Sequence, residues 1–339
     1  TGNGSAGNAQ TGVGFQPDLV WYKARSQAYN SGLFDVIRGA SKQLYSDQNS
    51  VEATYSGVTS FDSDGFTLGT DAGGNANGVT YVAWNWKAGN SQGSSNTDGS
   101  INTTYTSVNT TAGFSISTYN GNSTQGATLG HGLGVAPSMI MVKSTTHSED
   151  WAVANVGLNS TSPWDYYINL NSDGSKSQNN NRFGNVAPTS TVFTLGSSDE
   201  VNGSGKSYVA YCFAEKKGFS KFGEYSANGS ATDGPFIYTG FKPAFVMVKS
   251  HSNNSTNWVM LDNKRSSSGG SNDMDKWLYA NANDSEVDQA SSNPTDFLSN
   301  GFKLNNNGGY MNSSGRTYIY MAFAAQPLVS SNGDPANAQ

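Results

Sequence analysis

The sequence predicts an all-β fold, arranged as a tandem array of three homologous β-sandwich units of the jelly-roll type. A Gly-x-x-Pro opening, followed by an apolar run and a lysine, occurs three times, at residues 14–23, 134–143 and 240–249. Each copy later contains a Phe-x-Leu segment that begins 15 or 16 residues before an aromatic strand; the paired first residues are Phe66 and Tyr81, Phe193 and Tyr208, and Phe302 and Tyr318. Landmarks that recur in order and at matched spacing indicate homologous repeats. The short apolar runs between turn-rich segments are typical of strands, about six in each complete unit.

These landmarks divide the chain into five parts. Residues 1–90 form unit one, residues 113–217 unit two and residues 218–328 unit three. Residues 91–112 are predicted to be a linker, because the stretch opens with a Gly-, Ser- and Asn-rich composition that is typical of flexible segments. Residues 329–339 carry almost no apolar side chains, which predicts a disordered tail or the lead into another domain.

Unit one lacks a strand that the other two units have. Residues 1–5 match residues 119–123 and 225–230, which follow a predicted strand at 113–117 in unit two and at 218–222 in unit three. No counterpart of that strand stands before the first of these segments. We therefore expect the chain to be a fragment or a processed product of a longer polypeptide.

The closing strand of each unit indicates which side chains face the core. Large side chains alternate along one face of it in all three units: Val82, Trp84 and Trp86; Val209, Tyr211 and Phe213; Ile319, Met321 and Phe323. Because successive side chains of a strand point to opposite faces, this alternation marks a buried face. We expect Trp86, Phe213 and Phe323 to be equivalent core residues.

The strand after each proline is apolar on both faces, which is typical of a central strand covered on both sides. One sandwich covers only its inner face, so the other face requires a second layer of the same unit, a sister unit or another subunit. We therefore expect the chain to self-associate, as a homo-oligomer for which a trimer is one option, or to bind a partner protein through a substantial interface. The lysines that end these strands, Lys23, Lys143 and Lys249, are expected to place their ammonium groups in water.

One segment departs from the strand pattern. Leu33, Val36, Ile37, Ala40 and Leu44 recur at helical spacing, which predicts a short helix within residues 33–45.

The composition disfavours several classes of function. Only 13% of the residues are charged, against about 25% in a typical soluble domain. The net charge is −6 and the 19 basic residues form no cluster, so a nucleic-acid partner is not expected. No apolar run approaches the 18 or so residues that a membrane-spanning helix needs. The single cysteine, Cys212, lies within a predicted strand and is expected to be a buried, inert thiol.

Few residues are candidates for a catalytic, metal or cofactor site. Residues 2–7 match the dinucleotide fingerprint by letter, but no strand precedes them and no helix follows, so we expect no nucleotide. Asp62 and Asp64 resemble the start of a calcium loop, yet the bidentate acid that should follow is absent and a hairpin turn explains them better. The three histidines are dispersed, so no transition metal is expected. Trp164 and Tyr310 stand in loop-like contexts and are the candidate ligand-contact aromatics.

The repeated segments also resemble a known family. Residues 14–21, 60–69, 81–84, 214–223 and 234–241 are similar to a repeat domain of the structural proteins of tailed bacteriophages, found in tail-fibre and other virion-surface proteins, especially of marine phages. The resemblance extends over residues 1–328. It implies lectin-like β-sandwiches in a virion component, with no catalytic residues to carry over. One departure is Asn85, where the family pattern would have a cysteine between the two tryptophans.

Three hypotheses on function follow. The first is a non-enzymatic virion structural protein on the particle surface, as a tail fibre, a tail-associated protein or a capsid decoration, with other virion proteins as partners and the host surface as a further contact. The second is a lectin-like module that binds a host surface glycan. The third is a tail enzyme that cleaves glycans, since the spatial separation of paired carboxylates is not readable from sequence.

Overall fold

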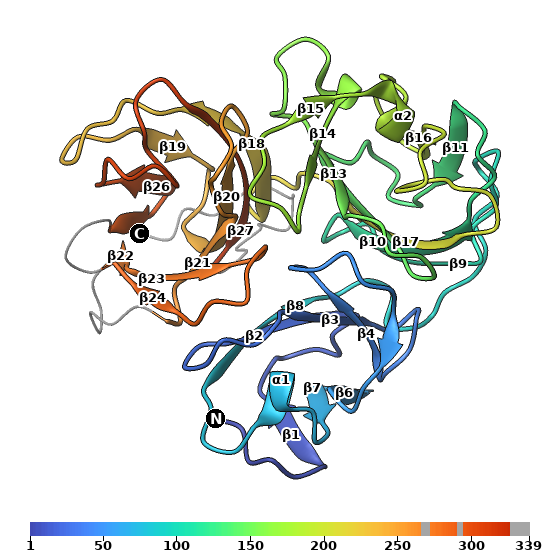
Figure 1. Ribbon diagram of the computed structural model, residues 1–339, viewed down its shortest axis with the longest axis horizontal. Coiled ribbons are helices and arrows are strands. Elements are labelled where there is room, and N and C mark those ends of the chain that lie inside the picture. Colours follow the sequence, from blue (N-terminus) through green and yellow to red (C-terminus); the bar gives the residue numbers. More distant parts are fainter. Residues whose placement is uncertain (266–271, 290–293, 326–339) are drawn as a thin grey trace.

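Apolar runs alternate with Gly-, Asn- and Ser-rich turns along the whole chain, and in the computed structural model nearly all of these runs are antiparallel strands. The structure describes residues 1–265, 272–289 and 294–325. The predicted all-β class is confirmed. Three two-sheet units follow one another along the chain and surround a common centre, with the larger sheet of each unit facing that centre (Figure 1).

Unit one pairs a five-stranded large sheet with a three-stranded small sheet. The large sheet has the order β5 (Ala53–Thr54), β4 (Lys42–Tyr45), β3 (Gly32–Asp35), β2 (Leu19–Ala24) and β8 (Tyr81–Trp86). The small sheet has the order β1 (Asn8–Thr11), β7 (Gly65–Leu68) and β6 (Val58–Asp62), and the single-turn helix α1 (Ala72–Asn75) lies beside it.

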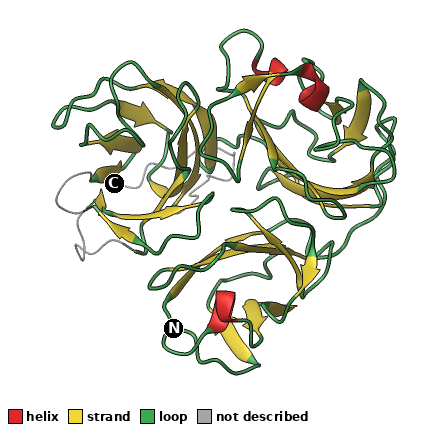
Figure 2. Ribbon diagram, in the orientation of Figure 1, coloured by secondary structure: helices red, strands yellow, loops and turns green. Residues whose placement is uncertain are grey.

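Unit two has a seven-stranded large sheet and a two-stranded small sheet. The large sheet has the order β15 (Ser177–Gln178), β14 (Tyr166–Asn169), β13 (Ala152–Asn155), β12 (Met139–Ser144), β17 (Ser207–Phe213), β10 (Phe114–Asn120) and β9 (Tyr105–Asn109). The small sheet pairs β11 (Ala127–Gly130) with β16 (Val192–Leu195). A 3-10 turn, η1 (Pro163–Asp165), and the helix α2 (Asn180–Phe183) lie in its loops (Figure 2).

Unit three has a six-stranded large sheet and a four-stranded small sheet. The large sheet has the order β18 (Ser220–Ser226), β27 (Thr317–Ala324), β20 (Pro243–Ser250), β21 (Val259–Asp262), β23 (Lys276–Tyr279) and β24 (Val287–Asp288). The small sheet has the order β19 (Phe236–Tyr238), β26 (Gly301–Leu304), β25 (Thr295–Leu298) and β22 (Asp273–Met274).

The three large sheets have corresponding strand orders. The orders β8-β2-β3-β4-β5, β17-β12-β13-β14-β15 and β27-β20-β21-β23-β24 run from the closing strand to the opposite edge. The register also corresponds, because the closing strand pairs with the post-proline strand through Trp84↔Trp21, Tyr211↔Met141 and Met321↔Met247. Units two and three add β10 and β18 on the other side of the closing strand, whereas no strand within residues 1–265, 272–289 and 294–325 takes that place beside β8.

Both faces of each post-proline strand are buried inside this one chain. Residues on one face pack in the core between the two sheets of their own unit; they are Val20 and Tyr22, Ile140 and Val142, and Val246 and Val248. Residues on the other face lie in a single hydrophobic cluster shared by all three units, the central core; they include Leu19 and Trp21, Met139 and Met141, and Phe245 and Met247. The predicted covering of both faces is confirmed. Since sister units provide it, the uncovered face from which we inferred a homo-oligomer does not exist.

Three aromatic rings, one from each unit, meet in the central core. The ring centroids of Trp86 and Phe213 are 6.3 Å apart, those of Trp86 and Phe323 5.8 Å, and those of Phe213 and Phe323 6.1 Å. All three pairs are edge-to-face, an arrangement that adds to the stabilisation from burial alone. The predicted equivalence of these three core residues is confirmed.

Two predicted segments differ in the structure. Residues 33–45 form no helix: β3 and β4 are joined by a turn in which Gly39 and Ser41 have positive φ angles, and Leu33 pairs directly with Leu44 across the strands. The apolar spacing that indicated a helix face therefore arises from cross-strand neighbours. Part of the predicted linker 91–112 is the strand β9, which adds to β10 as the edge of the large sheet of unit two.

The remaining parts of the domain prediction are limited by the described residues. The described part of unit three ends at residue 325, so residues 326–328 of the predicted unit and the predicted tail 329–339 lie outside the described residues. Cys212 is fully buried as a free thiol, as predicted. Among the residues that the structure describes, no helix is long and apolar enough to span a membrane.

Candidate functional site

The two aspartates considered for calcium serve the turns around them. Asp62 ends β6 and Asp64 is the second residue of the two-residue hairpin loop that leads into β7, which confirms the turn interpretation. The Asp64 carboxylate accepts hydrogen bonds from the backbone N–H groups of Gly14 at 2.6 Å and Gly12 at 3.0 Å, and these bonds lower its pKa. Asp62 accepts a hydrogen bond from the Thr67 hydroxyl at 2.7 Å. In the described part of the chain, no three His, Cys, Asp or Glu side chains group as metal ligands would.

The two candidate ligand-contact aromatics lie in different units and are not brought together. Trp164 lies in η1 and is only 7% exposed, because it packs in the core of unit two. Little of its ring is therefore available to a ligand. Tyr310 is half-buried in unit three, where its ring contacts those of Tyr279 and Trp277 at 5.7 and 6.4 Å.

The strongest polar feature shared by the three units is a set of buried lysines. Lys23, Lys143 and Lys249 are completely inaccessible to solvent, so the prediction that their ammonium groups reach water is wrong. Each ammonium donates a hydrogen bond to a backbone carbonyl oxygen of a neighbouring unit: Lys23 to Ala282 at 2.7 Å, Lys143 to Asn49 at 3.1 Å, and Lys249 to Asp173 at 3.1 Å. Unit one thus contacts unit three, unit two contacts unit one, and unit three contacts unit two.

A backbone hydrogen bond accompanies each lysine. The residue before each short edge strand donates its backbone N–H to a carbonyl oxygen of the neighbouring unit. The acceptor residue lies two positions after the buried lysine of that unit. The three bonds are Glu286 to Arg25 at 2.8 Å, Glu52 to Thr145 at 2.9 Å, and Lys176 to His251 at 3.1 Å. The lysine and backbone contacts follow the same cyclic order. The three units therefore form a closed ring in which each interface has the same two polar contacts.

Burial shifts the acid–base equilibrium of these lysines. Because the ammonium is removed from water, the pKa is lowered to about 8 for Lys23 and Lys143 and to about 7 for Lys249. Carbonyl acceptors stabilise each ammonium only in part. These side chains hold an interface together rather than bind a ligand.

We expect the protein to become more stable as the pH rises from about 7 to about 9.5. The three lysine pKa values are lower in the folded chain than the value of about 10.4 in an unfolded one, so the unfolded state binds more protons in this range. The free energy of unfolding then increases with pH. The limit is set by the buried tyrosines, whose raised pKa values reverse the slope above about pH 10. Urea unfolding at several pH values measures this.

The control is a variant with Lys23→Met, Lys143→Met and Lys249→Met, in which the slope should largely disappear while the fold is kept. A flat or falling stability for the natural chain over this range would contradict the lowered pKa values.

Two of the three interfaces also contain a buried aspartate–arginine pair. At the interface of units one and two, the Arg38 guanidinium contacts Asp35 at 2.5 Å and Glu52 at 3.1 Å. The Tyr211 hydroxyl of unit two donates to Asp35 at 2.7 Å. Arg38 is 3% exposed and Asp35 is fully buried, so each charge depends on the other.

The interface of units one and three has the corresponding arrangement. Arg265 contacts Asp262 at 2.6 Å and Glu286 at 2.9 Å, and the Trp84 indole N–H of unit one donates to Asp262 at 3.0 Å. Arg25 of unit one forms a bidentate pair with Glu286 at 2.7 and 2.9 Å. The Asp-x-x-Arg spacing of both pairs is visible in the sequence, but sequence reasoning missed it.

The third interface has no such ion pair. At the corresponding positions unit two has Asn155 and Leu158, and Leu158 is buried in the central core. The corresponding residue of unit three is Met321, in place of Tyr211 or Trp84. The same architecture is therefore built with either a charged or an apolar contact.

One close carboxyl pair in the described part of unit three does not have the geometry for cleaving a glycosidic bond. Asp296 and Asp273 share a hydrogen bond, which together with burial raises the pKa of Asp296. Hydrolysis requires carboxyl groups about 5 Å or more apart, so that the sugar or a water fits between them. A directly bonded pair does not provide that space.

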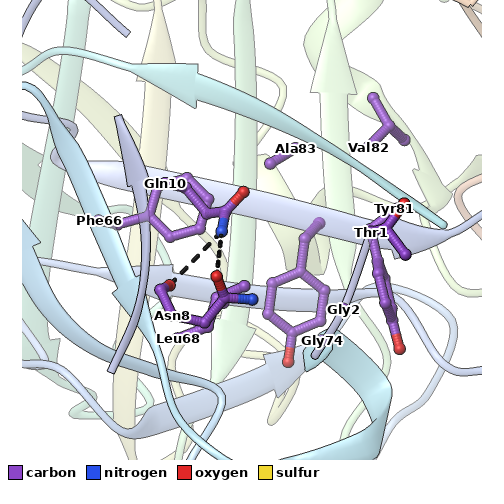
Figure 3. A pocket seen from close by; sticks show the side chains of 11 residues that line it. Thr1, Gly2, Asn8, Gln10, Phe66, Leu68, Gly74, Tyr81, Val82 and Ala83 are labelled. Carbon is purple, nitrogen blue, oxygen red and sulfur yellow. Dashed lines mark hydrogen bonds between the residues drawn. The ribbon is translucent and has the colours of Figure 1, made fainter. Parts of the chain in front are cut away.

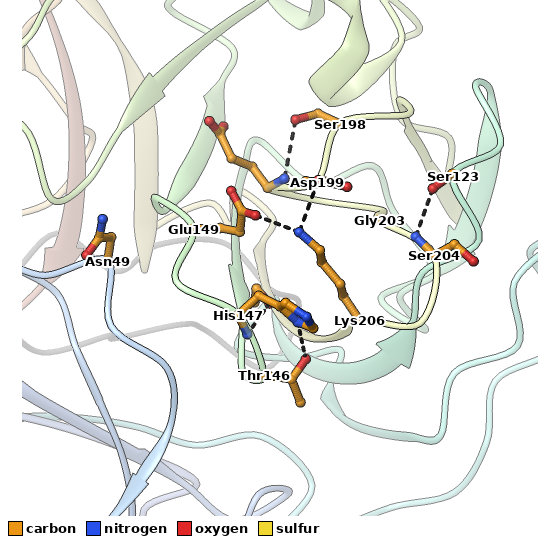
Figure 4. Close-up of polar contacts among 12 residues, drawn as sticks. Asn49, Ser123, Thr146, His147, Glu149, Ser198, Asp199, Gly203, Ser204 and Lys206 are labelled. Carbon is orange, nitrogen blue, oxygen red and sulfur yellow. Dashed lines mark hydrogen bonds and ion pairs between the residues drawn. The ribbon is translucent and has the colours of Figure 1, made fainter.

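A second polar cluster lies in the loops at one end of unit two (Figure 4). The Lys206 ammonium lies between the carboxylates of Glu149, at 2.6 Å, and Asp199, at 3.1 Å. His147 is exposed beside them, and its ring contacts the Thr146 hydroxyl at 3.0 Å. Lys206 forms ion pairs with both acids, so the cluster is an ion-pair network near the surface, of modest energy.

One pocket is lined by both aromatic and amide side chains (Figure 3). It opens between the two sheets of unit one, beside the end of β8 at Tyr81. Phe66 lines the opposite side, where Gln10 donates to the Asn8 side-chain oxygen at 3.0 Å. Thr1 lies at its rim.

Comparison with known proteins gives one match. A family model described as a domain of unknown function, DUF7483, matches residues 1–327. No curated protein and no solved structure matches the chain.

Proposed function

We propose that this chain, which belongs to the family described as domain of unknown function DUF7483, is a non-enzymatic structural protein of a bacteriophage particle. It would be exposed on the particle surface, as a tail fibre, a tail-associated protein or a capsid decoration. Other virion proteins would be its partners. The resemblance of its repeated segments to virion repeat domains supports the particle as its location.

The closed ring is the observation that carries the structural role. In an enzyme, buried charged groups often supply the perturbed pKa values of the reacting centre. Here the buried charged groups Lys23, Lys143 and Lys249 instead join one unit to the next. The chain's large aromatic side chains fill the central core. These groups support a rigid block with three outward-facing sandwiches, which suits a particle component.

The surface composition also supports a particle surface. Ser, Thr, Asn and Gly dominate the loops, and only 13% of all residues are charged. Desolvating neutral amides and hydroxyls costs less than desolvating charges, so such a surface can dock closely on a protein partner.

Electron microscopy of whole particles tests this proposal. A short epitope inserted after Val186, which is 50% exposed in a loop of unit two, gives a site for gold-labelled antibody. We expect label at one defined place on purified particles. Finding the tagged chain only in the soluble lysate, and never on particles, would refute the proposal.

A glycan array with the same tagged chain separates the structural role from the lectin-like alternative. A purely structural chain should bind no glycan. Binding that is lost in Tyr310→Ala, the candidate aromatic with ring surface left, would instead support the alternative. The matched control is Phe236→Ala, an exposed ring of the same unit.

A further inference from the structure

Among the residues that the structure describes, no strand pairs with one edge of the large sheet in unit one. In units two and three the closing strands β17 and β27 pair on both edges, with β10 and β18 on the side away from the post-proline strand. Of the described strands, β2 alone pairs with β8, the closing strand of unit one. Its second edge therefore presents backbone groups to which a further strand can bind.

The tyrosine at the start of each closing strand identifies corresponding positions in the adjacent turn. Its hydroxyl donates a hydrogen bond to a backbone carbonyl oxygen of that turn and accepts one from the backbone N–H of the residue four positions after the carbonyl. The carbonyl and N–H residues are Ala72 and Ala76 for Tyr81, Asp199 and Gly203 for Tyr208, and Gly309 and Ser313 for Tyr318. Gly74, Val201 and Met311 are the residues midway between these contacts. They therefore occupy the same position in the three units.

In units two and three, a tyrosine of the added strand occupies a socket at this position. Tyr119 of β10 stacks on Tyr208, with centroids 5.2 Å apart, and donates its hydroxyl to the Val201 carbonyl oxygen at 2.6 Å. In unit three the same two contacts occur at 5.2 and 2.8 Å, from Tyr225 to Tyr318 and to the Met311 carbonyl oxygen. The Tyr225 ring also contacts Phe302 at 6.2 Å and Tyr320 at 6.5 Å.

The pocket of unit one has the same walls without the tyrosine. Four residues that line this pocket stand at the same positions as the four residues around Tyr225 in unit three. Tyr81 corresponds to Tyr318, Gly74 to Met311, Phe66 to Phe302, and Ala83 to Tyr320. The pocket is thus the socket of a strand tyrosine, open in unit one.

The contacts of residues 3 and 5 show where Thr1 lies relative to the socket. The Asn75 side chain accepts from the Asn3 N–H at 2.9 Å and donates to the Ser5 carbonyl oxygen at 2.9 Å. Asn202 makes the same two contacts in unit two, with Asn122 at 2.9 Å and Thr124 at 3.1 Å. By this correspondence Thr1 stands where Asn120 stands in unit two, directly after the socket tyrosine, so the sequence match of residues 1–5 with 119–123 was wrong by one residue.

We propose that β8 and this pocket form a binding site for an antiparallel β-strand that leads into Thr1 and carries a tyrosine at its end. The strand adds to the open edge of β8, its tyrosine ring stacks on Tyr81, and its hydroxyl donates to the Gly74 carbonyl oxygen. An apolar side chain three residues before the tyrosine packs beside Trp84 in the central core. Ile116 of β10 and Phe222 of β18 have the corresponding positions in units two and three, opposite Tyr211 and Met321. Main-chain bonds supply affinity in this mode, and the socket supplies specificity.

An extension of the chain tests the proposal. The sequence of residues 113–119 is joined directly before Thr1, and hydrogen exchange is followed residue by residue. We expect the β8 amides that face away from β2 to exchange at least about tenfold more slowly, and the thermal midpoint to rise by about 5 °C. The amides of β12 and β17 report in the same sample that the rest of the fold is unchanged.

Two controls isolate the tyrosine. The same extension with alanine in place of its last residue should lose most of the protection, and so should the full extension on a Tyr81→Ala chain. If the full extension leaves β8 unprotected while β12 and β17 stay protected, the proposal is wrong. Binding of a mono- or disaccharide that is lost in Tyr81→Ala but kept when the extension is added would also overturn it, since the pocket would then be a sugar site that no strand tyrosine fills.

Discussion

Phe213→Ala is expected to lower the free energy of unfolding by about 3–5 kcal/mol. Phe213 is 1% exposed and meets rings from all sides: Trp86 and Phe323 from the other two units, and Phe114 stacked on it at 4.8 Å within its own. Alanine would remove the transfer free energy of the ring and leave a cavity at the point where the three units meet. Because packed rings fix one another there, the surroundings can collapse only in part. Urea unfolding measures the loss.

The matched control is Phe236→Ala, since Phe236 is 43% exposed on a small sheet of the same fold. It should change the free energy of unfolding by no more than about 0.5 kcal/mol. A loss of less than about 1 kcal/mol for Phe213→Ala would mean that the central core does not hold the ring together.

Arg38→Leu is expected to cost a comparable amount, about 3–5 kcal/mol, because it leaves the buried Asp35 carboxylate without its cation. The Tyr211 hydroxyl would remain as a donor to that carboxylate, which is not enough to replace a guanidinium. Arg38 also donates to the carbonyl oxygens of Leu33 and Lys42 at 3.1 and 3.0 Å, and these bonds would be lost with it. Denaturant unfolding again provides the measurement.

Unit two suggests the control for this variant. It carries Asn155 and Leu158 where unit one carries Asp35 and Arg38. The double variant Asp35→Asn, Arg38→Leu should therefore recover most of the stability, because replacing a buried ion pair by a neutral, apolar contact is often without cost. A double variant as unstable as Arg38→Leu alone would show that the loss came from packing rather than from the unpaired charge.

The strands and their buried faces were predictable because a strand has a period of two. Trp86, Phe213 and Phe323 were identified as core residues from alternation alone, and the structure places all three rings in contact. The same rule failed between Leu33 and Leu44, because cross-strand neighbours and helix neighbours can produce one pattern of spacing. Gly39 and its positive φ angle decide for a turn.

The ring and its buried lysines were not predictable in the same way. A lysine at a strand end usually reaches water, and nothing along the chain indicates that a carbonyl oxygen 76 or more residues away will accept its hydrogen bond. The recurrence of Lys23, Lys143 and Lys249 at one position was the available signal, because a lysine free in water has no need to recur. Trp164 shows the converse: its loop-like sequence context concealed a buried ring.

Ring closure has a consequence for how the chain folds. The contacts between the first and third units join residues about 260 positions apart, such as Arg25 and Glu286 or Lys23 and Ala282. Pairing at such separation is slow, since the loop entropy is lost before any of these contacts forms. A folding intermediate in which unit three has not yet closed the ring exposes the rings of Trp86 and Phe213, and such apolar surface is prone to aggregation. Synthesis from the N-terminus makes this exposure last at least as long as it takes to translate unit three.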